Sequence, residues 1–254
     1  MIPAVTFTHS GGALRIPWWV AGVRMAGFVP VVCDDGRDPL PGNVLGWLHA
    51  QGVDYRQTAW DRRGNLNGTD AAAGICAEVA AACGRHRSRY GLKVDDDTAV
   101  LDPELFTCAE QAAAVGLTWS GGRPGAFGMA YALRADVAAA VARHLTCLPL
   151  DPAAPEDLTV WSAAKALAGP EGVIQHEFDI EAGPFAALPW GSCVRDAVGR
   201  YGVITVGNHP PGGWTDRPRE TAEALRQVVC MARAEAMQPA RGSRPPQGAK
   251  GRVF

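Results

Sequence analysis

Short apolar runs alternate along the first half of the chain with segments whose apolar residues recur at helical spacing. Val29–Cys33 is nearly continuous in apolar residues, as is typical of a strand buried on both faces. Pro17 to Ala26 has a helical pattern with a proline in its first turn, and Gly27 can close the helix. Further strands are expected at about 5–8, 54–60, 92–94, 117–120, 126–133, 173–178 and 202–206, and helices at about 43–50, 69–83, 102–116, 135–145, 156–168 and 219–236. This alternation predicts an α/β fold with a mostly parallel central sheet flanked by helices.

Polar clusters follow several of these strands. They are His9–Gly12, Asp34–Gly36, Asp61–Gly68 and Asp95–Asp97. Parallel sheets bind ligands at the carboxyl ends of their strands. We therefore expect the four clusters to gather along one edge of the sheet and to form a binding site there.

Asp95, Asp96 and Asp97 end the short strand that begins near Leu92. Three adjacent carboxylates repel one another unless a cation or ordered donors offset them. Alternation along an extended chain would place Asp95 and Asp97 on one side and Asp96 on the other. Such hard oxygen ligands suit Mg²⁺ or Mn²⁺. A strand-to-helix corner with no ligand is the alternative, with Lys93 pairing with one of the aspartates.

Composition restricts the classes of function. The net charge of −2 gives no sign of a nucleic-acid surface. The seven cysteines have no C-x-x-C pair and no zinc spacing, which favours a reducing compartment. With no signal peptide and no apolar stretch of about 20 residues, we expect a cytoplasmic protein without a transmembrane segment. The abundance of Ala, Gly, Pro and Arg suggests a bacterial source. Residues 238–254 have a composition typical of a disordered tail.

Several motifs, taken in order, resemble the GT-A glycosyltransferases, which use nucleotide sugars and carry an Asp-x-Asp motif. These are Asp34-Asp35-Gly36, Asn67-Gly68 before a helix, and Asp95-Asp96-Asp97. Phe127–Asp136 is similar to the acceptor-side segment of fringe-like and related enzymes, and Pro155–Leu158 resembles their Glu-Asp motif. The resemblance covers roughly residues 4–210. It implies one GT-A-like catalytic domain over residues 1–237, with a nucleotide-sugar half at about 1–100 and an acceptor half at 101–237.

The resemblance also implies roles for individual residues. Asp97, with Asp95 or Asp96, would bind Mn²⁺ or Mg²⁺ at the donor diphosphate, and His209 would be a third ligand, for which His176 competes. Asp157 would be the general base of an inverting reaction, with Glu156 beside it in the motif. The donor nucleotide and its phosphates would be contacted by Thr6, Phe7, Thr8, Asp34, Asp35, Arg63, Asn67, Asp95 and Asp96. Trp190 and Trp214 could stack on a sugar.

The expected reaction is transfer of a hexosyl group from a nucleotide sugar to an acceptor hydroxyl. UDP is the donor nucleotide that such enzymes use most often. No sequence feature indicates the acceptor or the oligomeric state. Each motif also has a purely structural interpretation. Asp34-Asp35-Gly36 is a good turn sequence, and Glu156-Asp157 is an ordinary acidic first turn of a helix.

Other classes of protein share parts of these sequence patterns. A phosphotransferase of the haloacid-dehalogenase type needs its acidic motif on the first strand, with Thr or Val where this chain has Ala99. A calcium loop and a dinucleotide-binding loop both lack their glycines at the required spacing. A non-catalytic protein that binds a sugar nucleotide or a metal on the same fold remains an alternative.

Overall fold

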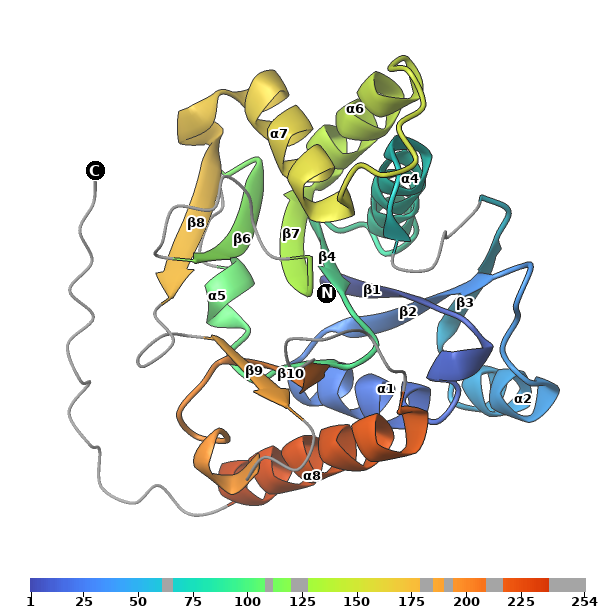
Figure 1. Cartoon of the computed structure of the whole chain (residues 1–254). Helices are drawn as coiled ribbons and strands as arrows, with labels where there is room; N and C mark the ends of the chain where they lie inside the picture. Colours follow the sequence, from blue (N-terminus) through green and yellow to red (C-terminus); the bar gives the residue numbers. More distant parts are fainter. Residues whose placement is uncertain are drawn as a thin grey trace.

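A computed structural model of the chain describes residues 1–60, 66–107, 112–119, 128–178, 185–189, 194–208 and 217–237. Arg63, Trp190, His209, Trp214 and the 238–254 segment lie outside these residues. A seven-stranded sheet in the order β3-β2-β1-β4-β7-β6-β8 forms the centre of the fold (Figure 1). All its strands run in one direction except β7, which is antiparallel to β4 and β6. The predicted α/β fold with a mostly parallel sheet is confirmed.

The inner strands of this sheet are mostly buried on both faces, as their apolar sequences predict, whereas the edge strand over residues 54–58 has exposed side chains. All six residues of β1 are buried. Successive residues point to opposite faces, so that Ala4 belongs to one hydrophobic cluster and Val5 to the other. The strand bounds are β1 Pro3–Thr8, β2 Val29–Asp35, β3 Asp54–Thr58, β4 Tyr90–Val94, β6 Ala114–Trp119, β7 Ala130–Arg134 and β8 Val173–Phe178.

Helices cover both faces of the sheet. In Figure 1, α4, α6 and α7 lie above it, and α1 and α8 lie below it. Gly91 on β4 allows α4 to pack closely, because a Cβ there would lie 2.7 Å from Val79 and 2.8 Å from Cys83. The bounds are α1 Ile16–Met25, α2 Gly42–Ala50, α4 Thr69–Arg85, α5 Glu104–Thr107, α6 Ala135–Thr146, α7 Glu156–Ala168 and α8 Pro218–Ala236. Of the described helices, none is both long and apolar enough to cross a membrane.

A second, three-stranded sheet lies beside the main one. It consists of β5 Thr98–Val100, β10 Val203–Asn208 and β9 Phe185–Pro189, in the order β5-β10-β9. β10 is antiparallel to β5 and parallel to β9. Because β5 begins directly after Asp97, this small sheet holds the carboxyl-terminal end of the Asp95–Asp97 segment in place.

The predicted helix over 102–116 is wrong. Of the described residues in this range, only Glu104–Thr107 are helical, and residues 114–116 already belong to β6. Pairing of β6 with β7 and β8 overrides the helical propensity of this alanine-containing segment. The strands at 98–100 and 185–189 were not predicted, because each is short and takes its conformation from β10.

Candidate functional site

The carboxyl ends of β1, β2, β3 and β4 bring the predicted polar residues together. In the strand register, Thr8 is paired with Asp34 and Asp35 with Thr58. Asp96, just beyond β4, accepts a hydrogen bond of 2.7 Å from the Thr8 hydroxyl. The prediction that polar clusters gather along this edge is therefore confirmed for His9–Gly12, Asp34–Gly36 and Asp95–Asp97.

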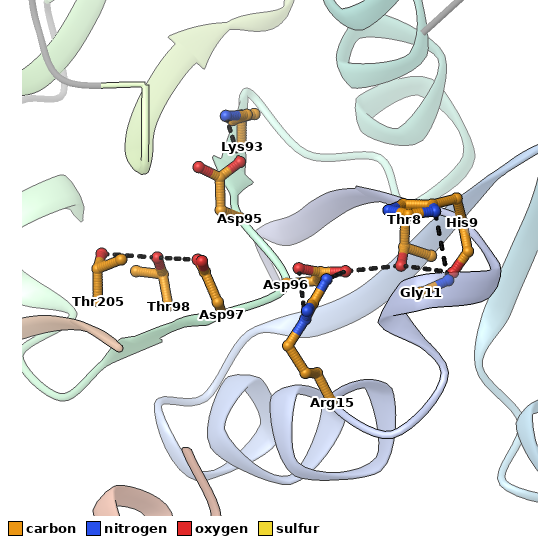
Figure 2. Close-up of polar contacts among 10 residues, drawn as sticks. All are labelled: Thr8, His9, Gly11, Arg15, Lys93, Asp95, Asp96, Asp97, Thr98 and Thr205. Carbon is orange, nitrogen blue, oxygen red and sulfur yellow. Dashed lines mark hydrogen bonds and ion pairs between the residues drawn. The ribbon is translucent and has the colours of Figure 1, made fainter. Parts of the chain in front are cut away.

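The three aspartates lie in a turn and not in an extended strand. β4 ends at Val94, and the Thr98 amide donates to the Asp95 carbonyl at 3.1 Å, as in a β-turn. Figure 2 shows the Asp96 side chain pointing away from those of Asp95 and Asp97. The predicted separation is thus present, but its predicted cause, alternation along an extended chain, is wrong. We call residues 95–98 the acidic turn.

Asp96 is held by Arg15, which immediately precedes α1. Arg15 donates from Nε to Oδ1 at 3.0 Å and from Nη2 to Oδ2 at 3.1 Å. Both residues are buried, with exposed fractions of 7% for Arg15 and 6% for Asp96. Gly12 lies against this contact, since a Cβ there would be 2.3 Å from Asp96 Oδ2 and 2.0 Å from Thr8 Oγ1. Asp96 therefore joins α1 to the acidic turn.

Asp95 is held on the opposite side by Lys93. The ammonium group donates to Asp95 Oδ1 at 2.6 Å and to the Gly128 carbonyl, and lies 3.7 Å from Glu156 Oε2. Burial favours the neutral amine, but the charges of Asp95 and Glu156 outweigh it and raise the pKa of Lys93. The pairing of Lys93 with an aspartate, expected as an alternative from the sequence, is confirmed.

Asp97 follows these two anchored neighbours in the turn and is half-buried. Its Oδ1 accepts a hydrogen bond of 3.2 Å from the Thr98 hydroxyl. Burial, followed by the charges of Asp95 and Asp96, raises the pKa of Asp97 to about 7. A bound cation would relieve this cost, because it favours the ionised carboxylate.

The Glu156-Asp157 pair begins α7 on the same side as Lys93. Glu156 is buried and accepts a hydrogen bond from the Tyr131 hydroxyl; burial raises its pKa to about 7. Asp157 is half-buried, and its Oδ1 accepts from the Leu158 amide at 2.8 Å. Its Cβ would be 3.3 Å from a Cβ added at Gly128, whose carbonyl binds Lys93. Asp157 is thus connected to Asp95 through Gly128 and Lys93.

Three of the residues predicted to contact the nucleoside are buried in the fold. Asp34 is fully buried and accepts from the Leu40 amide at 3.0 Å and from the Tyr55 hydroxyl at 2.8 Å. Burial raises its pKa. Thr6 is fully buried within β1, and Phe7 packs against Trp60 in the core. The structure thus places these three side chains inside the fold and not on the open edge.

Two predicted residues are placed nearer to solvent. Asp35, at the end of β2, is half-buried and accepts from the Arg37 amide at 2.9 Å. Asn67 is half-buried and lies two residues before the start of α4. Arg63 lies outside the described residues, so its predicted contact with the donor stays a prediction.

The two histidines proposed as a third ligand differ in their surroundings. His176 lies on β8, three strands from β4, and its Nε2 is 2.8 Å from the Leu105 carbonyl. His209 lies outside the described residues. The strand before it, β10, runs beside the acidic turn, because the Val206 amide donates to the Asp97 carbonyl at 3.0 Å. In the described parts of the chain, no group of three or more His, Cys, Asp or Glu side chains could hold a metal ion.

The carboxylates of the acidic turn could supply part of a Mg²⁺ or Mn²⁺ site. Asp95 and Asp97 supply hard carboxylate oxygens, and such ions keep several waters or take phosphate oxygens as their remaining ligands. Asp96 fits less well, because Arg15 and Thr8 already bind its oxygens. Asp97 with Asp95 is therefore the pair that matches the chemistry.

A cavity of about 510 Å³ lies elsewhere, between α4 and α6. Trp60, Ala73, Ala77, Leu145, Leu148 and Leu150 are among its lining residues. None of the predicted carboxylates lines it, so the acidic turn is not part of this cavity.

Comparison with known proteins gives structural likenesses only. No protein-family model matches the chain, and no curated protein matches it. Solved structures that resemble it include a glycosyltransferase involved in the glycosylation of the major capsid of PBCV-1, at 9% identity and a TM-score of 0.42, covering 90% of this chain and 100% of that one. Two structures of the glycosyltransferase GlyE from Streptococcus pneumoniae TIGR4 match at 9% and 8% identity, each with a TM-score of 0.47.

The GlyE matches cover 93% and 96% of this chain, which spans 64% and 67% of the GlyE chains. The strand order and directions of this chain define its α/β fold.

Proposed function

We propose that this chain is a metal-dependent glycosyltransferase that moves a hexosyl group from a nucleotide sugar, with UDP as the nucleotide, to an acceptor hydroxyl. The observation that carries the proposal is the placement of two carboxylates, Asp97 and Asp157. Asp97 lies in a turn at the carboxyl edge of a parallel sheet. Asp157 is connected to that turn through Gly128 and Lys93.

Asp97 and Asp95 are the residues proposed to hold Mn²⁺ or Mg²⁺ at the donor diphosphate. The metal would neutralise the negative charge that develops on the leaving diphosphate. We add His209 as a third ligand, supported by the pairing of β10 with the turn. Asp96 keeps its contacts with Arg15 and Thr8 and so holds the turn in place. Asp35 and Arg63 are proposed to contact the nucleoside and the diphosphate.

Asp157 is proposed as the general base of an inverting reaction. It takes the proton of the acceptor hydroxyl while the hydroxyl oxygen bonds to the anomeric carbon. The bond from that carbon to the diphosphate breaks, and the diphosphate leaves with the electron pair. Asp157 suits this role because it is only half-buried, whereas Glu156 beside it is buried against Tyr131.

The test measures binding before turnover. UDP binding is followed by calorimetry with and without Mn²⁺ for the wild type, for Asp97→Asn and for a matched control, Asp136→Asn. Asp136 is an exposed carboxylate at the start of α6 that pairs with Arg134. We expect the wild type to bind UDP only when Mn²⁺ is present. Asp97→Asn should weaken this binding about tenfold or more, which corresponds to about 1.4 kcal/mol. The control Asp136→Asn should leave the affinity unchanged.

Turnover then separates an enzyme from a binding protein. Wild-type protein is incubated with Mn²⁺ and a panel of UDP, GDP and dTDP sugars, and release of the diphosphate is measured. Metal-dependent binding without hydrolysis or transfer would indicate the non-catalytic alternative. Absence of metal-dependent binding for all three nucleotides would overturn the glycosyltransferase proposal.

A further inference from the structure

Lys93 is a charged side chain enclosed within the central sheet. Its exposed fraction is 1%, and it is the residue before the last on β4. Lysine is almost never fully buried unless it is paired. The ammonium group contacts three separate elements: Asp95 in the acidic turn, the Gly128 carbonyl just before β7, and Glu156 at the start of α7.

The contacts of the ammonium group are unequal. Asp95 Oδ1 is 2.6 Å away, whereas Glu156 Oε2 is 3.7 Å away. Glu156 receives its hydrogen bond from the Tyr131 hydroxyl instead. A lysine that served only to neutralise a buried glutamate would make its shortest contact with that glutamate. The geometry here directs the ammonium group at the acidic turn and leaves Glu156 as a second, more distant counter-charge.

The contact with Gly128 extends the same link to Asp157. The Gly128 carbonyl accepts from Lys93, and the Asp157 Cβ packs beside Gly128. Glu156, the neighbour of Asp157, is 3.7 Å from the same ammonium group. One cation therefore connects the proposed metal ligand Asp95 with the helix start that carries the proposed base.

We propose that Lys93 is a positioning residue that fixes Asp95 relative to Asp157 and competes with the divalent cation for the Asp95 carboxylate. This inference rests on the proposed function. A cationic partner on a ligand carboxylate opposes binding of a second cation. Removal of the ammonium group should therefore strengthen binding of Mn²⁺ alone and weaken catalysis, because Asp95 and Asp157 lose their common anchor.

The experiment uses a charge-balanced double variant. Lys93→Met alone would leave Glu156 buried without a counter-charge, which would strongly destabilise the fold. Lys93→Met combined with Glu156→Gln removes both charges and keeps an acceptor for Tyr131. Glu156→Gln alone is the matched control, because it removes the buried carboxylate while retaining the ammonium group. Circular dichroism and thermal melting establish that each variant folds.

Two further measurements test positioning. Binding of Mn²⁺ without nucleotide, measured by water proton relaxation, should be about threefold to tenfold tighter in the double variant than in Glu156→Gln. The kcat for transfer from the donor sugar should fall about tenfold or more in the double variant, while the donor KM changes less. A residue that only supports the fold would change neither quantity once the charges are balanced.

Each outcome decides the inference. Equal Mn²⁺ affinity and equal kcat in the double variant and Glu156→Gln would make Lys93 a counter-charge only. If the wild type binds Mn²⁺ but transfers no sugar, the proposed enzymatic function is wrong. The difference in Mn²⁺ affinity between the double variant and Glu156→Gln still decides whether Lys93 competes for Asp95. If neither the wild type nor the double variant binds Mn²⁺, both proposals are overturned.

Discussion

Arg15 binds both carboxylate oxygens of Asp96, although the two residues are 81 positions apart in the sequence. The Thr8 hydroxyl donates to the same carboxylate, so that Asp96 receives three hydrogen bonds from β1 and the residue before α1. Figure 2 shows this arrangement beside the separate contact of Lys93 with Asp95. The middle carboxylate of the acidic turn thus has a structural function, and its two neighbours supply the candidate ligands.

Replacement of Arg15 by Met should destabilise the protein strongly. It would leave the Asp96 carboxylate buried without its cationic partner, which typically costs about 3–5 kcal/mol. Urea unfolding of the wild type and the variant measures this difference. The double variant Arg15→Met with Asp96→Asn should recover part of the loss, because the buried charge is then absent. Equal stability of Arg15→Met and the wild type would contradict the role given to this ion pair.

Gly12→Ala should disrupt the same contact by steric overlap. Its Cβ would lie 2.0 Å from Thr8 Oγ1 and 2.3 Å from Asp96 Oδ2, so both side chains must move. We expect a loss of about 1–3 kcal/mol, as for overpacking of a core. Gly46→Ala in α2 is the control, since no atom lies within 4 Å of its added Cβ. That control should gain roughly 0.5–1 kcal/mol from higher helix propensity. A Gly12→Ala protein as stable as the control would refute the predicted clash.

Asp157→Asn should separate catalysis from donor binding. The amide cannot accept the proton of the acceptor, and loss of a general base lowers kcat by about 10²–10⁴-fold. UDP binding with Mn²⁺ should change little, because Asp157 is not one of the proposed metal ligands. Steady-state kinetics and calorimetry on the same preparations measure the two quantities. A kcat near the wild-type value would remove Asp157 from the proposed mechanism.

Glu156 should make the stability of the protein depend on pH. Its pKa is raised from 4.5 to about 7, chiefly by burial. Between these values the folded state binds more protons than the unfolded state, so stability falls as pH rises. At about 1.4 kcal/mol for each pKa unit, the decrease is up to about 3 kcal/mol. The charged or titratable groups near this carboxyl are Lys93, Tyr131, Cys76, Asp95 and Asp157.

Urea unfolding at about pH 5 and about pH 8 measures this dependence in the wild type and in Glu156→Gln. The variant lacks the titrating group and should lose less stability than the wild type between the two conditions. Parallel decreases in both proteins would show that Glu156 does not titrate in this range.

The sequence was most informative where a local pattern determines structure. The apolar run before Asp34 and the apolar residues before Asp95 both predicted strands that end at the same edge, and the structure confirms this. Asp34 itself was harder to interpret, because its engagement with Leu40 and Tyr55 depends on how the following loop folds back. Position along a strand was predictable, whereas the partner of each side chain was not.

Arg15 was missed because no local signal marks it. Its partner Asp96 becomes a neighbour only when β1 and β4 pair in the sheet. Lys93 was noticed beside the aspartates, but its contacts with Gly128 and Glu156 depend on β7 and α7. The helix expected over 102–116 failed for the same reason, since β6 takes its conformation from strands on both sides.

The pairing of β5 with β10 also sets the order in which the protein can fold. Thr98–Val100 begin at the last residue of the acidic turn, yet their only described strand partner is Val203–Thr205. Contacts between segments so far apart in the sequence form slowly, because a long loop must close first. During synthesis the turn can therefore acquire its final surroundings only after more than a hundred further residues have been added. A fragment ending near residue 100 would contain all three aspartates and still lack the strand that supports them.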